Sequence, residues 1–570
     1  MAPVDPTSQE AIRAEPSPPR KAVDALTASK KPPQETNAAI WTRRLTIASF
    51  WAIVIFLGLP IWWRATTIHR ASLPLQLMNE WADGKACRPE FPLQIAVEGL
   101  ALSTTDIHHL IRTTQHAIDD HNDFSAHHLR FIPSDTTQQD NSSQIVHTPG
   151  TSIDSRDAAL TIRLVPSAVG VTPRAELHPY ESTLDVFYSP NQLPSPSSTS
   201  SPLATFIALE LHKLYTEEKA ILAYLLSSST TSAPAQAPVL SQEMSENLAK
   251  RTTRSVKSAS TYHLTFSLFT PTFKPSDWAI EAALEEHLTP LLRALATISN
   301  FTVDTQVQLY AGFSPSIHEP VYHDELKAWR LRKEDLSGFI NAAEWPLSPS
   351  IGEGPTVNFV LYVPSEGQTP LIIQENSGDN WLVPQWGGVR ILNLPRTGEG
   401  SDIVPIRLTK ETLEGPLFTF SNQLLSLLGV PEAPLSLPLR LSTLVRVRAA
   451  SLLFSASSTL GSLARLTLAL PSISIPDTVA ESVDLTIAHL HQACDDLREG
   501  KFQSALENGR IADREVEKAF FEPAMVGQVY FPDEHKVAVY LPLLGPVAVP
   551  LIMAAVKEIR KSTQRRSGSK

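Results

Sequence analysis

The side chains best placed for covalent catalysis are His491 and Cys494, which lie three positions apart in a predicted helix. Residues three apart share a helix face, so the imidazole could serve as the base that activates the thiol. A nucleophilic cysteine also needs partial exposure and an oriented base, whereas Cys494 falls on the apolar stripe of its helix. We therefore interpret Cys494 as a packed core thiol and assign no catalytic residue.

Two histidine pairs, His108-His109 and His127-His128, are candidates for metal binding. Adjacent residues on a helix do not face one another, and no neighbouring set of Asp, Glu, His or Cys completes a ligand shell. Solvated or helix-capping roles are favoured, so we assign no metal ligand. The loops Gly352-Glu-Gly354 and Gly398-Glu-Gly400 lack the strand-then-helix setting of a phosphate cradle and are expected to be turns. No cofactor is predicted.

Signature motifs of the common enzyme classes are absent from the sequence. It contains no H-E-x-x-H, G-x-S-x-G, Walker A or paired C-x-x-C pattern. Two N-x-S/T triplets, at Asn141 and Asn300, are glycosylation candidates, although a chain this rich in Ser and Thr produces about two such triplets by chance.

Two uncharged apolar stretches, residues 45–63 and 537–556, lie near the ends of the chain. Each is about twenty residues long and, as a helix, matches the roughly 30 Å hydrocarbon core of a bilayer. A cleaved signal peptide is disfavoured for the first stretch because some forty residues precede it and no A-x-A-like site follows. A buried soluble hairpin is the disfavoured alternative for the second. Its three prolines, Pro542, Pro546 and Pro550, are spaced by four and predict a kinked helix that packs on other membrane helices.

The basic residues predict the orientation in the membrane. Arg43 and Arg44 precede the first apolar stretch, and the tail 557–570 carries six Lys or Arg residues. By the positive-inside rule both termini are expected in the cytosol, with residues 64–536 on the lumenal side. Residues 1–40 are rich in proline and poor in large apolar residues, so a disordered cytosolic arm is expected.

Composition limits the partners and the covalent framework. The chain has 570 residues, a net charge of −11 and a pI near 5.9, so nucleic acid is not expected as a partner. Only two cysteines occur, Cys87 and Cys494. They could form a disulfide, but two free, buried thiols are the favoured interpretation.

Alternating strand and helix patterns predict a mixed α/β lumenal domain with a partly parallel sheet flanked by helices, and a helical C-terminal part. Strands are expected at 93–97, 160–165, 184–188, 262–269, 302–310, 357–363, 371–374 and 389–394. Helices are expected at 105–122, 203–226, 415–428, 439–466 and 502–520, with polar or Ser/Pro-rich segments at 134–158, 189–202 and 227–238. We see no internal repeat.

Two further helices are expected from their start signals. Ser276 can cap a helix whose apolar positions run from Trp278 to Leu295. Thr478-x-x-Glu481 has the pattern of a capping box for a helix that ends before Gly500.

The tripeptide Trp386-Gly387-Gly388 enters the last predicted strand, and Trp381 lies just before it. Two consecutive glycines at a strand start indicate a bulge or tight turn, with a tryptophan packed in the core. This interpretation is favoured over contact with a ligand.

The membrane-proximal and C-terminal segments together resemble the PIG-S family. The resemblance is carried by Gly58-Leu-Pro-Ile-Trp-Trp63, Arg70-Ala-Ser-Leu-Pro74, Asn358-Phe-Val-Leu-Tyr-Val-Pro364, Trp386-Gly-Gly-Val-Arg-Ile-Leu-Asn393, Ala519-Phe-Phe-Glu-Pro523, Tyr530-Phe-Pro-Asp533 and the run 540–550. Their order and spacing agree from about residue 40 to the end. The residues taken to be structural in these motifs are Gly58, Pro60, Trp62, Trp63, Trp386, Gly387, Gly388, Phe520, Phe521, Pro523, Pro542, Pro546 and Pro550.

The resemblance implies a non-catalytic subunit of the glycosylphosphatidylinositol (GPI) transamidase, in the endoplasmic reticulum membrane. Its implied partners are the other subunits, including a caspase-like cysteine protease subunit that carries the nucleophile, and membrane lipid, which could include GPI. The lumenal domain would brace the complex, and the helices around Cys494, which lead into the second apolar stretch, would transmit membrane position to it. Two alternatives are a membrane-tethered lumenal hydrolase or transferase with an unrecognised site, and a lone receptor or cargo adaptor.

Overall fold

The computed structural model describes residues 36–66, 69–134, 158–195, 197–229, 241–275, 277–311, 318–339, 354–395, 407–471, 473–526 and 533–567. The chain divides into two compact units. The first combines Met1–His69 with Val529–Lys570, and the second is Arg70–Gln528. Most of the predicted cytosolic arm, the polar segment 135–157 and the glycine loop at 398–400 lie outside the described residues.

The first unit contains two helices long and apolar enough to cross a bilayer, Asn37–Ile61 and Ala538–Lys561. The N-terminal helix consists of α1 (Asn37–Ile53), a π-helical turn η1 (Val54–Gly58) and α2 (Leu59–Thr66). In that turn the Leu59 N–H bonds to the carbonyl of Val54, five residues earlier. Pro60 follows directly, and the wider turn accommodates this residue, which has no N–H to donate. The predicted stretch 45–63 lies inside this helix.

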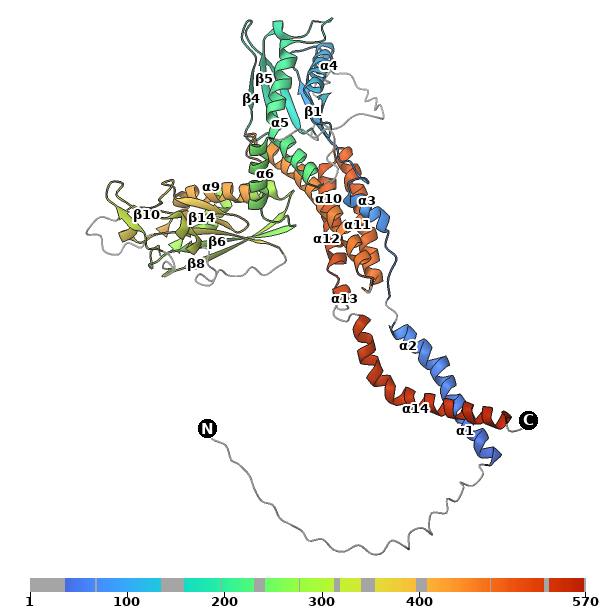
Figure 1. Cartoon of the computed structure of the whole chain (residues 1–570). Coiled ribbons are helices and arrows are strands. Elements are labelled where there is room, and N and C mark those ends of the chain that lie inside the picture. Colours follow the sequence, from blue (N-terminus) through green and yellow to red (C-terminus); the bar gives the residue numbers. More distant parts are fainter. Residues whose placement is uncertain are drawn as a thin grey trace. The chain divides into compact units, whose positions relative to one another are not determined.

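The C-terminal helix of the first unit is α14 (Asp533–Ser567), with Pro542, Pro546 and Pro550 in its interior. Figure 1 shows α14 bent along its length, as the proline spacing predicts. Glu558 joins the two helices: its carboxylate accepts hydrogen bonds from Arg43 Nε at 3.0 Å and Arg44 Nε at 2.7 Å. Two of the basic residues used for the orientation prediction are thus neutralised within the pair of helices.

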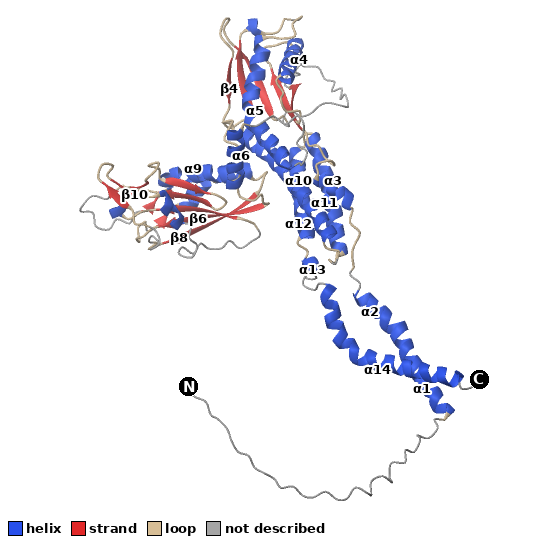
Figure 2. Ribbon diagram, in the orientation of Figure 1, coloured by secondary structure: helices blue, strands red, loops and turns tan. Residues whose placement is uncertain are grey.

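The second unit contains two five-stranded sheets with helices packed on them (Figure 2). The first sheet has the order β2-β1-β3-β5-β4, in which β4 alone is antiparallel to its neighbour. Its strands are β1 (Phe91–Glu98), β2 (His127–Pro133), β3 (Leu160–Pro166), β4 (Arg174–Leu177) and β5 (Thr183–Tyr188). The helices α4 (Thr104–Asp120) and α5 (Pro202–Ser229) belong to its hydrophobic core.

The second sheet has the order β13-β14-β11-β6-β8, in which β13 alone is antiparallel to its neighbour. Its strands are β6 (Thr261–Phe269), β8 (Asn300–Gln308), β11 (Thr356–Tyr362), β13 (Asn380–Val383) and β14 (Gly387–Ile391). One face packs on α7 (Ile280–His287), α8 (Thr289–Leu295) and α9 (Lys410–Leu427). The other face packs on β10 and β12 of a small sheet with the order β12-β10-β9, formed by β9 (Val321–His323), β10 (Ala328–Leu331) and β12 (Leu371–Ile373).

The two large sheets have the same topology. In each, the first strand pairs in parallel with the second and third, and the antiparallel strand forms the edge beside the last. A helical connection separates the first two strands of each sheet, and a long helix follows the last. The sequence shows no repeat and predicts one sheet, so the mixed α/β class is confirmed while the number of sheets is not. Strand order depends on hydrogen bonds between backbones, and many different sequences can form the same pairing. The order of the strands and the number of sheets therefore leave little trace in the sequence.

The remaining helices form a bundle that shares its core with the first sheet. They are α3 (Leu75–Ala82), α10 (Leu437–Ala469), α11 (Asp477–Arg498) and α12 (Phe502–Phe520). Shorter elements are α6 (Gln242–Arg254), α13 (Pro523–Val526), β7 (Asp277–Trp278) and β15 (Arg407–Leu408), together with the 3-10 turns η4 (Pro190–Gln192), η5 (Lys333–Phe339) and η6 (Glu366–Gln368). Leu441 and Leu444 of α10 also enter the core of the second sheet. One long helix therefore contributes to both cores.

Both predicted helix-start signals are wrong. The helix expected after Ser276 begins at Ile280, with Ala279 as the N-cap, because Trp278 pairs with Leu408 in a two-stranded sheet; Ser276 lies outside the described residues. The helix α11 begins at Asp477 with Pro476 as the N-cap, so Thr478 lies inside the first turn and forms no capping box. Proline fixes the extended backbone at that boundary instead.

Candidate functional site at the junction of α5, α6 and α10

Two consecutive glutamates of α5, Glu217 and Glu218, contact different parts of the second unit. They mark the junction between its two halves, of which one contains the first large sheet and the other contains the second. Glu218 is 3% exposed and contacts α10. Glu217 reaches α6 and the segment that joins α9 to α10. Adjacent helix residues are separated by about 100° around the axis, which allows one helix to supply both contacts.

Glu218 and Arg446 form a buried ion pair. The Glu218 carboxylate accepts hydrogen bonds from Arg446 Nε at 2.6 Å and Nη2 at 2.7 Å, and from Thr443 Oγ1 at 2.5 Å. Burial alone would raise the pKa of Glu218, but the positive charge of Arg446 and the hydrogen bonds outweigh it, so the pKa lies well below its usual range. Burial alone would lower the pKa of Arg446, and the Glu218 carboxylate raises it instead. Both groups are therefore charged.

His127, at the start of β2, lies against this pair. Its Nε2 is 3.5 Å from Glu218 Oε1, and its ring centroid is 5.7 Å from that of Tyr215. Burial lowers the pKa of His127, although Glu218 partly opposes the effect. The solvated or capping role predicted for His127 is therefore wrong: the β2 strand turns this side chain into the core.

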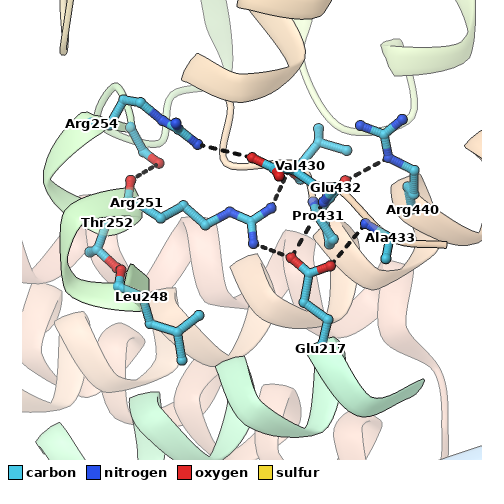
Figure 3. A network of polar contacts seen from close by, with 11 residues as sticks. Glu217, Leu248, Arg251, Thr252, Arg254, Val430, Pro431, Glu432, Ala433 and Arg440 are labelled. Atoms are coloured by element: carbon cyan, nitrogen blue, oxygen red, sulfur yellow. Dashed lines mark hydrogen bonds and ion pairs between the residues drawn. The ribbon is translucent and has the colours of Figure 1, made fainter. Parts of the chain in front are cut away.

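Glu217 organises a second, partly exposed network around the loop between α9 and α10 (Figure 3). Its carboxylate binds the Arg251 guanidinium of α6 and accepts a hydrogen bond from the Ala433 N–H at 2.9 Å. Arg251 Nη2 also donates to the Val430 carbonyl at 2.5 Å, and Arg440 Nε donates to the Pro431 carbonyl at 2.5 Å. The loop 430–433 is thus held by charged side chains from three helices.

A cavity of about 1200 Å³ opens beside this network. Its lining comes mainly from α5 and α6, with Pro384 and the residues 432–433. Its lining includes both basic and acidic groups, among them Lys213, Lys250, Arg254, Glu243 and Glu432. Charges of both signs around an open cavity suit a polar macromolecular surface or a zwitterionic group better than a simple anion.

Arg448, two residues after Arg446, contacts the second sheet. Its guanidinium donates to the Tyr262 hydroxyl of β6 at 3.2 Å, to the Leu428 carbonyl at 3.2 Å and to Ser299 Oγ at 3.3 Å. Arg448 is 6% exposed. The helix α10 is therefore joined to both halves of the unit by buried arginines.

A disulfide joins Cys87, which follows α3, to Cys494 in α11. The favoured prediction of two free thiols is wrong, and so is that of a packed core thiol at Cys494. The same fact removes the His491–Cys494 pair as a catalytic candidate, because the sulfur is already bonded; His491 instead lies edge-on to Trp81, with ring centroids 4.9 Å apart. Sequence could not decide the pairing, since 407 residues separate the two cysteines.

The N-terminal end of the second unit is fixed to the same bundle. Arg70 donates to the carbonyls of Thr467 at 2.8 Å and of Pro471, and the Ala71 N–H donates to the Ile475 carbonyl at 2.9 Å. These carbonyls belong to the C-terminal end of α10 and the residues after it, where helical carbonyls lack internal partners. The bundle therefore gathers residues from the beginning and the end of this unit.

A model of the family of phosphatidylinositol-glycan biosynthesis class S proteins, PIG-S, matches residues 49–565. The chain belongs to the PIG-S family. A human relative, named GPI-anchor transamidase component PIGS, is 28% identical over 549 residues that cover 90% of this chain and 95% of the human one. Relatives in Schizosaccharomyces pombe, named GPI transamidase component PIG-S homolog, and Saccharomyces cerevisiae, named GPI transamidase component GPI17, are 26% and 24% identical and cover 92% and 90% of this chain.

The PIG-S match includes the first apolar helix from residue 49 onward, the second apolar helix and the whole second unit, so the resemblance read from the sequence is confirmed. Among its motif residues, Trp386 is the last residue of the tight turn between β13 and β14, and Gly387 and Gly388 are the first two residues of β14. A Cβ atom on Gly387 would lie 1.8 Å from the Asn358 carbonyl oxygen of β11, and one on Gly388 would lie 1.9 Å from Gln423 Oε1 of α9. Gly387 is therefore needed for the close approach of β14 to β11, and Gly388 for the packing of α9 on the sheet.

The other PIG-S motif residues lie near the ends of the bundle and in the apolar helices. Phe520 ends α12 and packs partly buried, whereas Phe521 is exposed and Pro523 begins α13. Gly58 lies in the π-helical turn, Trp63 in α2 is exposed, and Trp62 is in the same helix. Of the glycosylation candidates, Asn300 is exposed at the start of β8, and Asn141 lies outside the described residues.

The sequence reasoning overlooked the junction residues of this PIG-S protein: Glu217, Glu218, Arg251, Arg446 and Arg448. The available signal was their context. Glu217-Glu218 and Arg446-Val-Arg448 lie in helical stretches that are rich in apolar residues, and charged side chains are rarely buried unless they are paired. Which acid pairs with which base is not encoded by spacing, because the partners are 228 residues apart.

Proposed function

We propose that this PIG-S protein is a non-catalytic subunit of the GPI transamidase complex in the endoplasmic reticulum membrane. The supporting observation is the family match over residues 49–565, whose relatives from human and yeasts are named transamidase components. In this role the protein supports the transfer of proprotein C-termini onto GPI, while the nucleophilic cysteine belongs to a caspase-like subunit. Both cysteines of this chain are joined in a disulfide, which is consistent with a nucleophile located elsewhere.

The proposed topology places both termini in the cytosol and the second unit in the lumen. It is supported by the two apolar helices, by the basic residues at 43–44 and 557–570, and by the disulfide, which suits an oxidising compartment. The exposed Asn300 sequon provides a test. An endoglycosidase-sensitive mobility shift that is lost in Asn300→Gln would place β8 in the lumen. Protection of an N-terminal tag from protease in sealed microsomes would contradict cytosolic termini.

The mechanical role follows from the junction. The arginines of α10 join the two sheets, and the disulfide joins both chain ends of the unit, so the lumenal part can act as a brace for its partner subunits. Membrane lipid, GPI among the candidates, would contact the apolar helices, where Pro542, Pro546 and Pro550 bend α14.

The decisive experiment is a mild-detergent pull-down of the tagged full chain with mass spectrometry of its partners. Co-purification of a caspase-like cysteine protease subunit with further membrane subunits is expected. Recovery of this chain alone, from cells that make GPI-anchored proteins, would overturn the proposal. An intrinsic transferase or hydrolase activity of the purified chain would overturn its non-catalytic part.

A further inference from the structure

Four edge strands bound the two large sheets, and three of them are short or protected. The strands β4 and β13 have four residues each, and β4 carries the exposed Arg174 and Glu176. The strand β2 contains Arg130 and Pro133. Gln115 of α4 also caps its edge, donating to the Leu129 carbonyl at 2.9 Å and accepting from the Phe131 N–H at 3.2 Å. Such features prevent pairing with foreign strands.

The fourth edge strand, β8, lacks these features. It is nine residues long, from Asn300 to Gln308, and contains no Lys, Arg, Pro or Gly. It pairs in parallel with β6 along its whole length and is the terminal strand of its sheet among the described strands. A long, regular edge of this kind is a template for a further strand.

The side chains of β8 extend the hydrophobic core outward. Val303 pairs in register with the buried Leu264 of β6, and Val307 pairs with the buried Leu268. Yet Val303 is 38% exposed, Val307 is 50% exposed, and Leu309, the next residue in the same alternation, is 41% exposed. The apolar rows of the sheet thus end at solvent, and one more strand would cover them.

We propose that the outer edge of β8 binds an extended strand of another subunit, which adds a sixth strand to this sheet. The inference rests on the proposed function, because it requires the chain to be part of a complex. Main-chain hydrogen bonds would provide affinity, and apolar or β-branched residues opposite Val303 and Val307 would provide specificity.

Asp304 distinguishes a different chain from a second copy of this one. It is the only charged residue of β8 and is exposed. A two-fold symmetric pair of β8 strands that matched all nine residues would be antiparallel about Asp304 and would place two carboxylates opposite each other. A heterologous strand can instead place Lys or Arg opposite Asp304, so a basic residue is expected at that position of the partner.

The glycosylation candidate is compatible with this arrangement. Asn300 is the first residue of β8 and alternates with Thr302 and Asp304, on the face opposite to Val303 and Val307. The Thr302 hydroxyl is bonded to His263 Nδ1 at 2.6 Å, which fixes this end of the strand against β6. A glycan on Asn300 would therefore leave the valine face and the later part of the edge accessible.

The test uses the tagged full chain in cells that lack their own copy. A photo-crosslinking residue at position 307 is expected to form an adduct with one other subunit, whereas the same residue at position 326, in an exposed turn of the same half, is expected to form none with that subunit. Val303→Lys with Val307→Lys is expected to lower recovery of the crosslinked subunit at least about tenfold, a loss of about 1.4 kcal/mol. The matched control Leu326→Lys, at a residue 48% exposed, should leave recovery unchanged.

The outcomes separate this inference from the proposed function. If the unmodified chain recovers no transamidase subunits, the proposed function fails first. In other outcomes the unmodified chain recovers these subunits while position 307 forms no crosslink, or crosslinks only to a differently tagged second copy or within its own chain. In each of these cases the strand proposal is overturned and the proposed function stands. Unchanged recovery with the double lysine variant would also overturn it. An unfolding midpoint equal to that of the Leu326→Lys chain would show that lost recovery reflects the edge and not the fold.

Discussion

Arg446 and Arg448 lie two positions apart on α10, and their guanidinium groups contact opposite halves of the second unit. Arg446 binds Glu218 beside the first sheet, and Arg448 binds Tyr262 and Ser299 at the second. Residues two apart are about 200° apart around a helix axis, so one helix can direct both side chains outward to different partners. Among the described partners of the two arginines, only those of Arg446 include a carboxylate. Loss of Arg446 would therefore leave a buried charge without its partner, whereas loss of Arg448 would remove only hydrogen bonds to neutral groups.

Removing one member of the buried ion pair should be strongly destabilising. Arg446→Met leaves the Glu218 charge buried without its partner, and we expect a loss of about 3–5 kcal/mol in the free energy of unfolding. The double variant Arg446→Met with Glu218→Leu should recover most of this loss, because no charge remains uncompensated. Denaturant unfolding of the purified full chain in detergent measures both, and additive losses in the double variant would contradict the ion-pair interpretation.

Arg448→Met is the comparison for that series. This change removes the donor to the Tyr262 and Ser299 hydroxyls and to the Leu428 carbonyl, but it leaves no buried charge without a partner. A smaller loss of about 1–3 kcal/mol in the free energy of unfolding is therefore expected. A loss equal to that of Arg446→Met would show that burial of the side chain, and not charge pairing, decides the cost. Lys410→Met, at an exposed ion pair with Glu286, should have no measurable effect.

The disulfide between Cys87 and Cys494 should contribute strongly to the stability of the second unit. It closes a loop across 407 residues of sequence, and constraining the unfolded chain in this way is typically worth about 2–5 kcal/mol. Thermal unfolding with and without reductant should therefore differ for the natural chain. The double variant Cys87→Ala with Cys494→Ala should unfold at the lower temperature and be insensitive to reductant. Equal midpoints for all samples would exclude the bond.

The glycine pair that begins β14 should tolerate side chains poorly. Gly387→Ala would drive a Cβ atom into the Asn358 backbone of β11, and we expect a loss of about 3 kcal/mol or more, with poor expression. Gly388→Ala should cost less, because its obstacle is the Gln423 side-chain amide, which can move. Gly367→Ala is the matched control, since nothing lies within 4 Å of its added Cβ atom. Similar stability for all three variants would contradict the close packing.

His127 should make the fold sensitive to mild acid. Burial lowers its pKa in the folded protein, so between the usual value of about 6.5 and that lower pKa the unfolded chain binds the extra proton. Stability should thus fall with acidification below about pH 6.5, by at most about 1.4 kcal/mol per pH unit. The pKa of Glu218 is also lowered, but this group affects stability only at pH values below the usual pKa range of a glutamate, which is a lower pH window than that of His127. His127→Gln should flatten the slope between pH 6.5 and 5, and an unchanged slope would assign it to other groups.

Transmission between the bundle and the membrane should depend on a rigid connection after α12. Inserting a flexible Gly-Ser linker after Phe521 is expected to reduce GPI attachment to a reporter protein while leaving the unfolding midpoint of the chain unchanged. The same linker inserted next to Gly367, in an exposed 3-10 turn, is the control and should leave attachment intact. Normal attachment with the linker after Phe521 would exclude a mechanical role for this segment.

Local patterns in the sequence predicted many of the elements of this protein and its two apolar helices. Periodicity located α12 to the residue and placed β3, β5, β6, β11, α5 and α10 within a few residues of their ends, because each buries one face or one continuous apolar run. The ordered motifs identified the PIG-S family, and length with lack of charge identified both apolar helices. The start signals at Ser276 and Thr478 failed, since strand pairing at Trp278 and the fixed backbone of Pro476 overrode local capping preference.

The tertiary structure alone decided which distant residues meet. The pairing of Cys87 with Cys494, of Glu218 with Arg446 and of β6 with both β8 and β11 joins residues tens to hundreds of positions apart. The repeated sheet topology was equally hidden, because backbone hydrogen bonds define strand order and leave side chains free to diverge. Burial then changes chemistry: it turns His127 from a surface histidine into a core group and makes isolated charges costly unless a partner arrives from another helix. Sequence encodes such contacts only through the complete fold.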